Sequence, residues 1–136
     1  WLADASSGFV HLEEGDAGGA SPADKIAAVL ESIVFLIATN LAAMNSMRGK
    51  PDRLLVTGGL GTVDPLLQCL ANISGMPVER AQSSEATARG LACLLAGMPD
   101  NWPAARIEQA FVPQPDADLL VRFKRWQELM PPLPAD

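Results

Sequence analysis

The fold is decided by one stretch, Arg53-Leu54-Leu55-Val56-Thr57-Gly58-Gly59-Leu60-Gly61-Thr62-Val63-Asp64-Pro65. Leu54 to Val56 predict a short buried strand, because three apolar residues run directly into a pair of glycines. The glycines predict a tight turn whose backbone a ligand can approach closely. Asp64 followed by Pro65 predicts a helix start, with Asp64 as the N-cap. A strand, a glycine turn and a helix start in this order indicate either a nucleotide or phosphate site or a purely structural turn.

The bulk composition restricts the class of protein. A chain of 136 residues with 49% hydrophobic and 19% charged residues predicts one globular domain with a core. The net charge of −6 argues against binding to a nucleic-acid backbone. Cys69 and Cys93 lack a CxxC spacing, and His11 is the only histidine, so metal sites and a Ser-His-Asp triad are not expected. We expect buried thiols and a cytoplasmic protein.

The segment before the central stretch predicts a short strand around Gly8–Leu12 and then a long helix. Ser21-Pro22-Ala23-Asp24 is a helix start, with serine as N-cap, proline at the first position and an acid at the third. The helix is predicted to run from Pro22 to about Arg48, with Gly49 as C-cap. Its middle, Ile33–Ala38, is apolar on all sides. This favours a helix covered by a sheet and by a second element over a membrane span.

The segment after the central stretch continues the alternation of helix and strand, which predicts an α/β layered domain. A run of small residues including Gly90 in one of its helices predicts close approach to a neighbouring element. The predicted elements are a helix over Pro65–Ile73 ended by Gly75, a strand over Met76–Arg80, a helix over Glu85–Ala96 capped by Ser83 or Ser84, and an amphipathic helix over Asp116–Met130.

Four segments in register resemble the carboxy-terminal part of the FGGY family of carbohydrate kinases, most closely its glycerol-kinase-like members. Each segment is similar to one family motif, and their order and spacing also agree. They are Ala28–Ile33, similar to "A-x-L-E-[SG]-I"; Leu54–Gln68, similar to "GG-A-x-x-N-x-x-L-M-Q"; Leu70–Arg80, similar to "L-A-D-I-L-G-x-P-V-E-R-P"; and Glu85–Gly97, similar to "E-x-T-A-L-G-A-A-x-L-A-G".

The resemblance implies part of an actin-like ATPase fold, also described as ribonuclease-H-like, with a helical C-terminal tail. Residues 1–98 would form part of the nucleotide-side domain, and residues 99–136 would form the tail packing on it. The implied activity is ATP-dependent phosphorylation of a hydroxyl group on a small carbohydrate of the glycerol or pentulose class.

The resemblance also implies which residues face the nucleotide. Gly58, Gly59 and the backbone near Leu60 would lie against it. The family's asparagine falls on Val63, so a side-chain hydrogen bond to the base is not expected there. Asp64 next to it either replaces that bond or caps the helix. The implied ligand is ATP or ADP with Mg, whose ligands are not expected in this chain.

No catalytic residue is expected in this chain. The family's base, phosphate loop and most sugar-binding residues precede the tryptophan that Trp1 resembles, so we expect the chain alone to be inactive. Its expected partners are ATP and a sugar or polyol bound mainly by the missing N-terminal part. We expect no nucleic acid and no membrane. Because two strands of the family sheet would also be missing, exposed edges and apolar surface are expected. They would be covered by self-association, by swapping of elements or by the absent rest of the chain.

Two alternatives remain open from the residues. Gly59-Leu60-Gly61 before a helix, with Glu79 twenty residues after Gly59, is similar to a Rossmann-type NAD-binding unit. A non-catalytic interaction domain is the other alternative, because Val63 and Arg89 depart from the family pattern. The Rossmann unit predicts NAD binding, the kinase part predicts ATP or ADP binding, and the interaction domain predicts neither.

Overall fold

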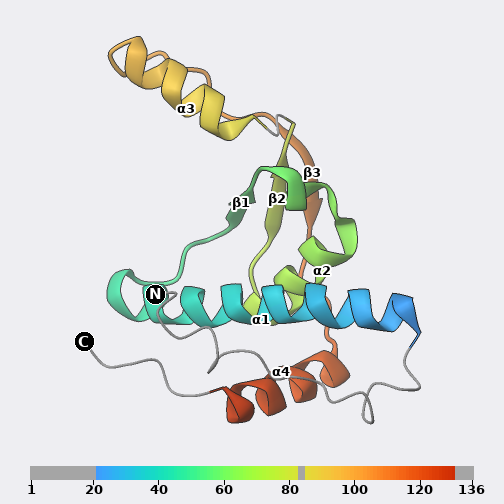
Figure 1. The fold of residues 1–136 in the computed structure, drawn as a ribbon. Coiled ribbons are helices and arrows are strands. Elements are labelled where there is room, and N and C mark those ends of the chain that lie inside the picture. The colour runs from blue at the N-terminus through green and yellow to red at the C-terminus, as the bar shows by residue number, and fades with distance from the viewer. Residues whose placement is uncertain (1–20, 83–84, 131–136) are drawn as a thin grey trace, which may run out of the picture.

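The computed structural model of this protein describes residues 21–82 and 85–130. The predicted strand around Gly8–Leu12 and the predicted cap at Ser83 or Ser84 lie outside these residues. The elements alternate as expected for an α/β domain (Figure 1). They are α1 (Pro22–Arg48), β1 (Leu54–Val56), the 3₁₀ turn η1 (Gly59–Thr62), α2 (Asp64–Ser74), β2 (Val78–Ala81), α3 (Ala86–Leu95), β3 (Ile107–Phe111) and α4 (Ala117–Leu129).

Helix α1 begins and ends where the sequence predicts. The Ser21 hydroxyl accepts from the Asp24 amide, and the Asp24 carboxylate accepts from the Ser21 amide, which completes a capping box. At the other end Gly49 has a φ of 84° and donates its amide to the Asn45 carbonyl. Local sequence therefore fixes both ends of this helix.

The described strands form one sheet in the order β1-β2-β3. β1 and β2 are parallel, and β3 runs antiparallel to β2. The sequence analysis did not predict β3, so the segment after residue 98 is not only helical. Four of the five residues of β3 are exposed and Phe111 alone is buried, which removes the alternation that identifies a strand. The predicted final helix is confirmed as α4, with Asp116 as its N-cap.

The core lies where α2 packs between α1 and the sheet. Leu67 and Ala71 of α2 are fully buried, and they share one cluster with Val34 of α1, Val78 of β2 and Phe111 of β3. Gly75 ends α2 in the left-handed conformation with a φ of 63°, as predicted. Helix α2 therefore lies between the long helix and the sheet.

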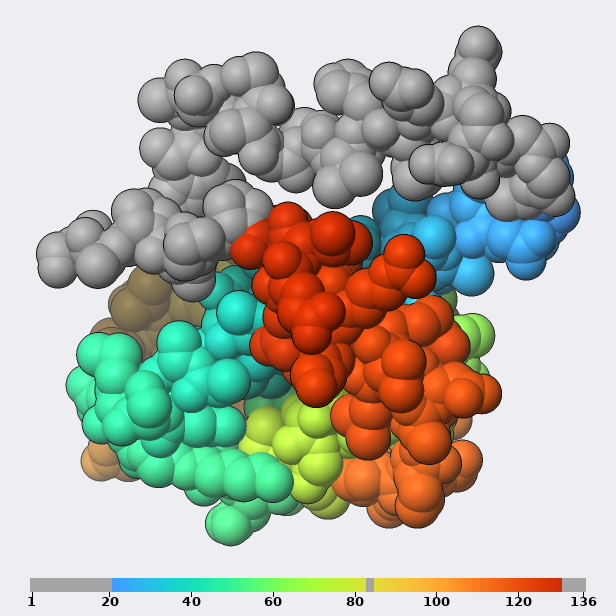
Figure 2. All heavy atoms as spheres, turned by 90° about the horizontal axis from the view of Figure 1, so that it is seen from below, coloured from blue at the N-terminus to red at the C-terminus, as the bar shows by residue number. Residues whose placement is uncertain are grey.

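Helix α4 lies across the middle of α1 on the face seen in Figure 2. The Phe35 ring of α1 lies 5.2 Å from the Phe123 ring and 5.8 Å from the Trp126 ring, centroid to centroid. The carboxylate of Glu31 accepts two hydrogen bonds from the Arg122 guanidinium. Helix α1 is therefore covered by α2 and α4, rather than by a sheet and one further element. By length and composition alone, α1 would also be apolar enough to cross a membrane.

Helix α3 projects away from the rest of the molecule (Figure 1). None of its residues is buried, and Leu91, Leu94 and Leu95 are 58%, 63% and 80% exposed. A Cβ built on Gly90 would meet nothing within 4 Å. The predicted close approach of a neighbour at Gly90 is therefore wrong for the part of the chain that the structure describes.

Candidate functional site

The glycine turn follows directly from the carboxyl end of β1. Gly58 has a φ of 89°, a conformation that residues with a side chain rarely adopt. A Cβ on Gly61 would lie 3.4 Å from Cγ1 of Val56, so Gly61 sits tightly against the strand. The Gly61 amide donates to the Gly58 carbonyl, and the Thr62 hydroxyl donates to the Gly59 carbonyl. These glycines and bonds together set the path of the turn.

The outer face of this turn is open. A Cβ built on Gly58 or on Gly59 would meet nothing within 4 Å, and Leu60 is 50% exposed. The first amides of a helical turn have no acceptor inside it, and in η1 these belong to Gly59 and Leu60. The backbone here is accessible to a ligand, which is the property that the sequence analysis assigned to Gly58, Gly59 and Leu60.

Val63 and Asp64 have other neighbours than expected. Val63 is the N-cap of α2, its carbonyl accepts from the Leu66 amide, and its side chain packs against the core cluster. Asp64 is the first residue of α2 and makes no capping bond, so the predicted N-cap at Asp64 is wrong. Its carboxylate instead accepts a hydrogen bond from Arg80, because that charged donor lies within reach on β2. The nucleotide-binding role of Gly58, Gly59, Leu60, Val63 and Asp64 stays a prediction.

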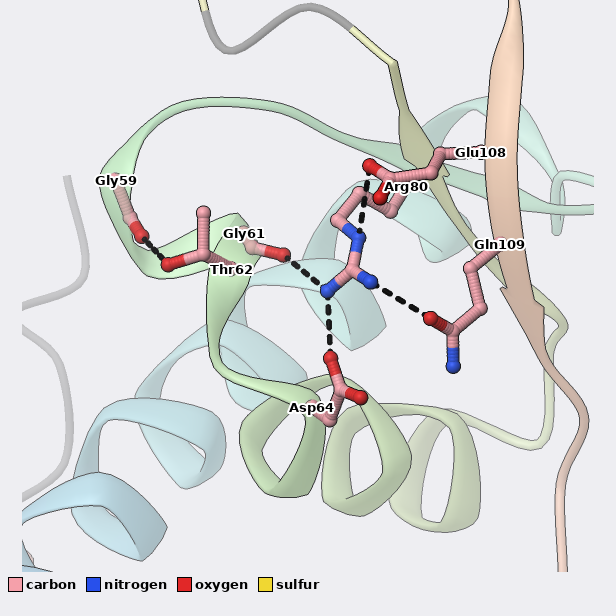
Figure 3. A network of polar contacts seen from close by, with 7 residues as sticks. All are labelled: Gly59, Gly61, Thr62, Asp64, Arg80, Glu108 and Gln109. Carbon is pink, nitrogen blue, oxygen red and sulfur yellow. Dashed lines mark hydrogen bonds and ion pairs between the residues drawn. The ribbon is translucent and has the colours of Figure 1, made fainter.

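Arg80 is the centre of a polar network beside the turn (Figure 3). Its Nη1 donates to the Gly61 carbonyl at 3.3 Å and to Oδ1 of Asp64 at 2.5 Å. Its Nη2 donates to Oε1 of Gln109 at 2.6 Å, and its Nε lies 3.3 Å from Oε2 of Glu108. One side chain on β2 thus contacts the turn, the start of α2 and β3.

The charge of Arg80 is already balanced by its neighbours. The hydrogen bond to Asp64 raises the pKa of Arg80, with the Asp64 and Glu108 charges acting in the same direction and burial acting against them. The guanidinium therefore stays positive at every pH at which the protein would be studied. Two carboxylates face this single cation, so Arg80 offers little uncompensated positive charge to an incoming anion.

Two cavities adjoin the turn. The smaller, of about 150 Å³, is lined by the turn and by Arg80 and Glu108. The larger, of about 530 Å³, lies between the sheet, α3 and the segment around Trp102, and its lining is mainly apolar. The two share Thr57, Ala81 and Gln82, which follow β1 or end β2. Ligands of α/β sheets bind at the carboxyl ends of parallel strands, which is where both cavities lie.

Sequence reasoning missed Arg80, Glu108 and the larger cavity. The charged pair Glu79-Arg80 inside the short strand Val78–Ala81 was the available signal for Arg80. Glu108 belongs to a strand that the sequence did not reveal. The larger cavity is lined on one side by Arg89, whose guanidinium lies 5.8 Å from the Trp102 ring centroid and donates to the Pro103 carbonyl. Only the tertiary structure brings these residues together.

Glu79 does not occupy the position of a ribose-binding acid. It lies in the middle of β2, paired in register with Leu55, and its carboxylate lies 3.4 Å from the Arg53 guanidinium. In a dinucleotide-binding unit the acid follows the second strand and faces the ligand crevice. The geometry of Glu79 therefore gives no support to the NAD alternative.

The two cysteines and the possible metal ligands were the remaining candidates for chemistry in this region. Cys69 and Cys93 are free thiols, both partly buried. Burial raises the pKa of Cys69, assisted by the negative charges of Glu31 and Asp116, so its thiol stays protonated at neutral pH. Within residues 21–82 and 85–130 there is no group of three histidine, cysteine, aspartate or glutamate residues that would hold a metal ion.

Comparison with known proteins identifies relatives among carbohydrate kinases. Residues 1–98 match the family described as the FGGY family of carbohydrate kinases, C-terminal domain. The chain is 35% identical over 123 residues to glycerol kinase of Trichodesmium erythraeum and 34% identical over 140 residues to glycerol kinase of Methylibium petroleiphilum. These alignments cover 84% and 93% of this chain but 24% and 27% of the relatives, so the chain spans about a quarter of their length.

A solved structure agrees with these relatives. The ligand-bound xylulose kinase from Lactobacillus acidophilus superimposes with a TM-score of 0.57 and 26% sequence identity. The superposition covers 75% of this chain and 23% of that protein. The expected actin-like architecture is therefore confirmed for the part of the chain that aligns.

Proposed function

This chain belongs to the FGGY family of carbohydrate kinases, and we propose that it forms the nucleotide-facing part of an ATP-dependent kinase. The proposed acceptor is a hydroxyl group of a small sugar or polyol of the glycerol or pentulose class. The names of the relatives, glycerol kinase and xylulose kinase, support that class of substrate. The bound nucleotide would supply the phosphoryl group, and this chain would bind and orient it.

The observation that carries the proposal is the open backbone at Gly58 and Gly59. A Cβ built at either position would have no protein atom within 4 Å. Both glycines follow the carboxyl end of β1, which is parallel to β2. A nucleotide approaching there would contact main chain and no bulky side chain. The residues present therefore fit a nucleotide lying against the turn.

The size of the smaller cavity supports a partial site. Cavities that hold a whole small ligand measure about 300–1,000 Å³, whereas the cavity that Gly58 and Gly61 line measures about 150 Å³. The adjoining cavity of about 530 Å³ falls within that range, but no glycine of the turn lines it. Phosphoryl transfer also needs a metal-bound phosphate and an oriented nucleophile. The described residues lack a cluster suited to Mg²⁺. We therefore propose that residues 1–136 by themselves bind nucleotide weakly and do not phosphorylate a sugar.

Calorimetric titration with ADP–Mg tests the binding proposal, with NAD titrated in parallel. The informative variant is Gly59→Leu, because a Cβ there meets no protein atom within 4 Å and the added side chain therefore starts in the space proposed for the ligand. We expect it to weaken ADP binding by at least about tenfold, which corresponds to about 1.4 kcal/mol. Ala43→Leu is the matched control, since it adds the same side chain at an exposed position of α1 away from the turn. Its ADP affinity should equal that of the unmodified protein.

Four results would change the proposal. Equal ADP affinity in Gly59→Leu and the unmodified protein would move the nucleotide away from the turn. Binding of NAD instead of ADP would favour a dinucleotide unit, and binding of neither would favour an interaction domain. Phosphorylation of glycerol or xylulose by the 136-residue protein in a coupled ADP-release assay would overturn the proposal that it is inactive alone.

A further inference from the structure

We propose that Arg80, held by Glu108 and Gln109 of β3, is a positioning residue that fixes the glycine turn for nucleotide binding. The inference rests on the proposed function and extends it to residues beyond 98, where the family match ends. In this proposal β3 contributes to the site through Glu108 and Gln109, in addition to pairing with β2.

The turn needs support from outside because its own packing is sparse. Gly58 and Gly59 have no side chain, Leu60 is half exposed, and Thr62 is exposed. Gly61 touches β1, but its carbonyl points to Arg80 on the next strand. Since the same Nη1 also binds Asp64, one atom of Arg80 connects the turn to the first residue of α2 (Figure 3).

A β-bulge brings both β3 partners to Arg80. Arg80 pairs with Gln109, but the next residue of β2, Ala81, pairs with Ile107, so Glu108 is the extra residue. Successive residues of a regular strand point to opposite faces. The bulge breaks that alternation and lets Glu108 and Gln109 both contact the same guanidinium. Bulges of this kind redirect side chains and are common beside functional sites.

The guanidinium is fixed on several sides. Its central carbon lies 5.7 Å from the centroid of the Phe111 ring, which is itself buried in the core cluster. The Arg80 side chain is 14% exposed, whereas those of Asp64 and Glu108 are about half exposed. A planar guanidinium group that contacts an aromatic ring and three polar side chains has little conformational freedom. Because its charge is compensated, Arg80 acts on a ligand through the turn and not by direct attraction.

Amide hydrogen exchange of the turn tests the positioning role without requiring a ligand. In Arg80→Met we expect the amides of Gly61 and Thr62 to exchange about tenfold faster or more, because a charge-assisted bond to the turn is lost. Arg80→Lys keeps the charge but not the fork, and should fall between Met and the unmodified protein. Arg122→Met is the matched control, since it removes an arginine that binds a carboxylate between α1 and α4, away from the turn.

A second variant covers the case in which Arg80→Met fails to fold. Glu108→Gln keeps the shape of the side chain and removes one charge that holds Arg80. It should accelerate exchange in the turn by about threefold, since one ion pair of this kind contributes modestly. Unchanged exchange at Gly61 and Thr62 in the folded Arg80→Met or, failing that, in Glu108→Gln would overturn the inference.

The ADP titration separates this inference from the proposed function. With ADP binding present in the unmodified protein, Arg80→Met should weaken it about tenfold while Arg122→Met leaves it unchanged. Loss of ordering in the turn with unaltered ADP affinity would overturn the link between Arg80 and the nucleotide. Absence of ADP binding in the unmodified protein would refute the proposed function for this chain, whereas the exchange measurement would still decide whether Arg80 orders the turn.

Discussion

Helices α2 and α3 begin from equivalent positions and end in different environments. Each follows a strand of the parallel pair, α2 after β1 and α3 after β2, and each carries a mainly apolar face. Yet α2 buries four residues between α1 and the sheet, and α3 buries none. An apolar helical pattern therefore predicts that a helix forms, but the presence of a partner surface decides whether its apolar face is buried.

The connections to the two helices explain part of the difference. The short glycine turn reverses the chain after β1, so that α2 packs against the sheet. Arg80 stabilises this arrangement through its hydrogen bonds to Gly61 and Asp64. The segment that carries α3 contacts the sheet where it leaves β2 and where it returns to β3, and Leu91, Leu94 and Leu95 of α3 are exposed. The body of the molecule and its α3 arm should therefore respond differently to the same substitution.

The largest expected difference is between one leucine in each helix. Leu67→Ala should lower the free energy of unfolding by about 3 kcal/mol, because Leu67 is fully buried and its removal leaves a cavity. Leu94→Ala, at a side chain that is 63% exposed, should change it by less than about 0.5 kcal/mol. Urea unfolding followed by circular dichroism measures both. Equal losses would show that α3 is packed against a partner surface in solution.

A smaller effect is expected where α4 covers α1. Phe35→Leu keeps the site apolar but removes the ring contacts with Phe123 and Trp126, so we expect a loss of about 1 kcal/mol. Urea unfolding followed by circular dichroism measures this loss. Leu36→Ala is the neighbouring control, since Leu36 is about half exposed and its loss should matter less. A larger loss for Leu36 than for Phe35 would contradict the observed orientation of α1.

The ion pair between the same two helices should contribute less again. Arg122→Met should lower stability by about 0.5 kcal/mol, because the Arg122 side chain is half exposed and water screens the pair with Glu31. The difference from the unmodified protein should shrink further in 1 M salt. Stability curves at low and high salt measure this, and a loss that persists unchanged at 1 M salt would mean that the pair is better shielded than described.

The smallest effect concerns the cap of α1, which α2 lacks. Hydrogen bonds from Ser21 lower the pKa of Asp24 below its ordinary 3.8. A folded-state pKa below the unfolded value gives stability that is present above about pH 4 and is lost as pH falls through the folded value. Asp24→Asn should therefore remove a small acid-dependent loosening of the first turn of α1. Amide shifts of Ser21 and Asp24 between pH 5 and 2 would record it, and their invariance would contradict the capping box.

Local sequence patterns predicted correctly those structural features that depend only on residues close together in the chain. Ser21 to Asp24 predicted the start of α1, and Gly49 and Gly75 predicted two helix ends, because caps involve residues a few positions apart. The strand, the glycine turn and α2 were found for the same reason. The four family-like segments gave the right family because their spacing is a property of the chain and not of its packing.

The same rules failed where distant residues compete. Asp64 before Pro65 predicted a cap, but Arg80, sixteen residues later in the numbering, takes the carboxylate. Strand β3 was missed since its exposed residues are held by pairing with β2 and by the Arg80 network, neither of which is visible in the segment Ile107–Phe111. The close packing predicted around Gly90 depends on a surface that is absent from the described residues.

The backbone bond between the Gln82 amide and the Arg106 carbonyl, 2.8 Å long, closes the base of the segment that carries α3. This segment is therefore a long connection between two antiparallel strands, and it leaves the sheet and returns to it at the same place. Antiparallel neighbours can be joined by a hairpin of two residues, and each halving of a loop reduces its closure entropy cost by about 0.6 kcal/mol. Strands β2 and β3 would therefore find one another faster and hold one another more firmly if a short hairpin replaced the segment that carries α3.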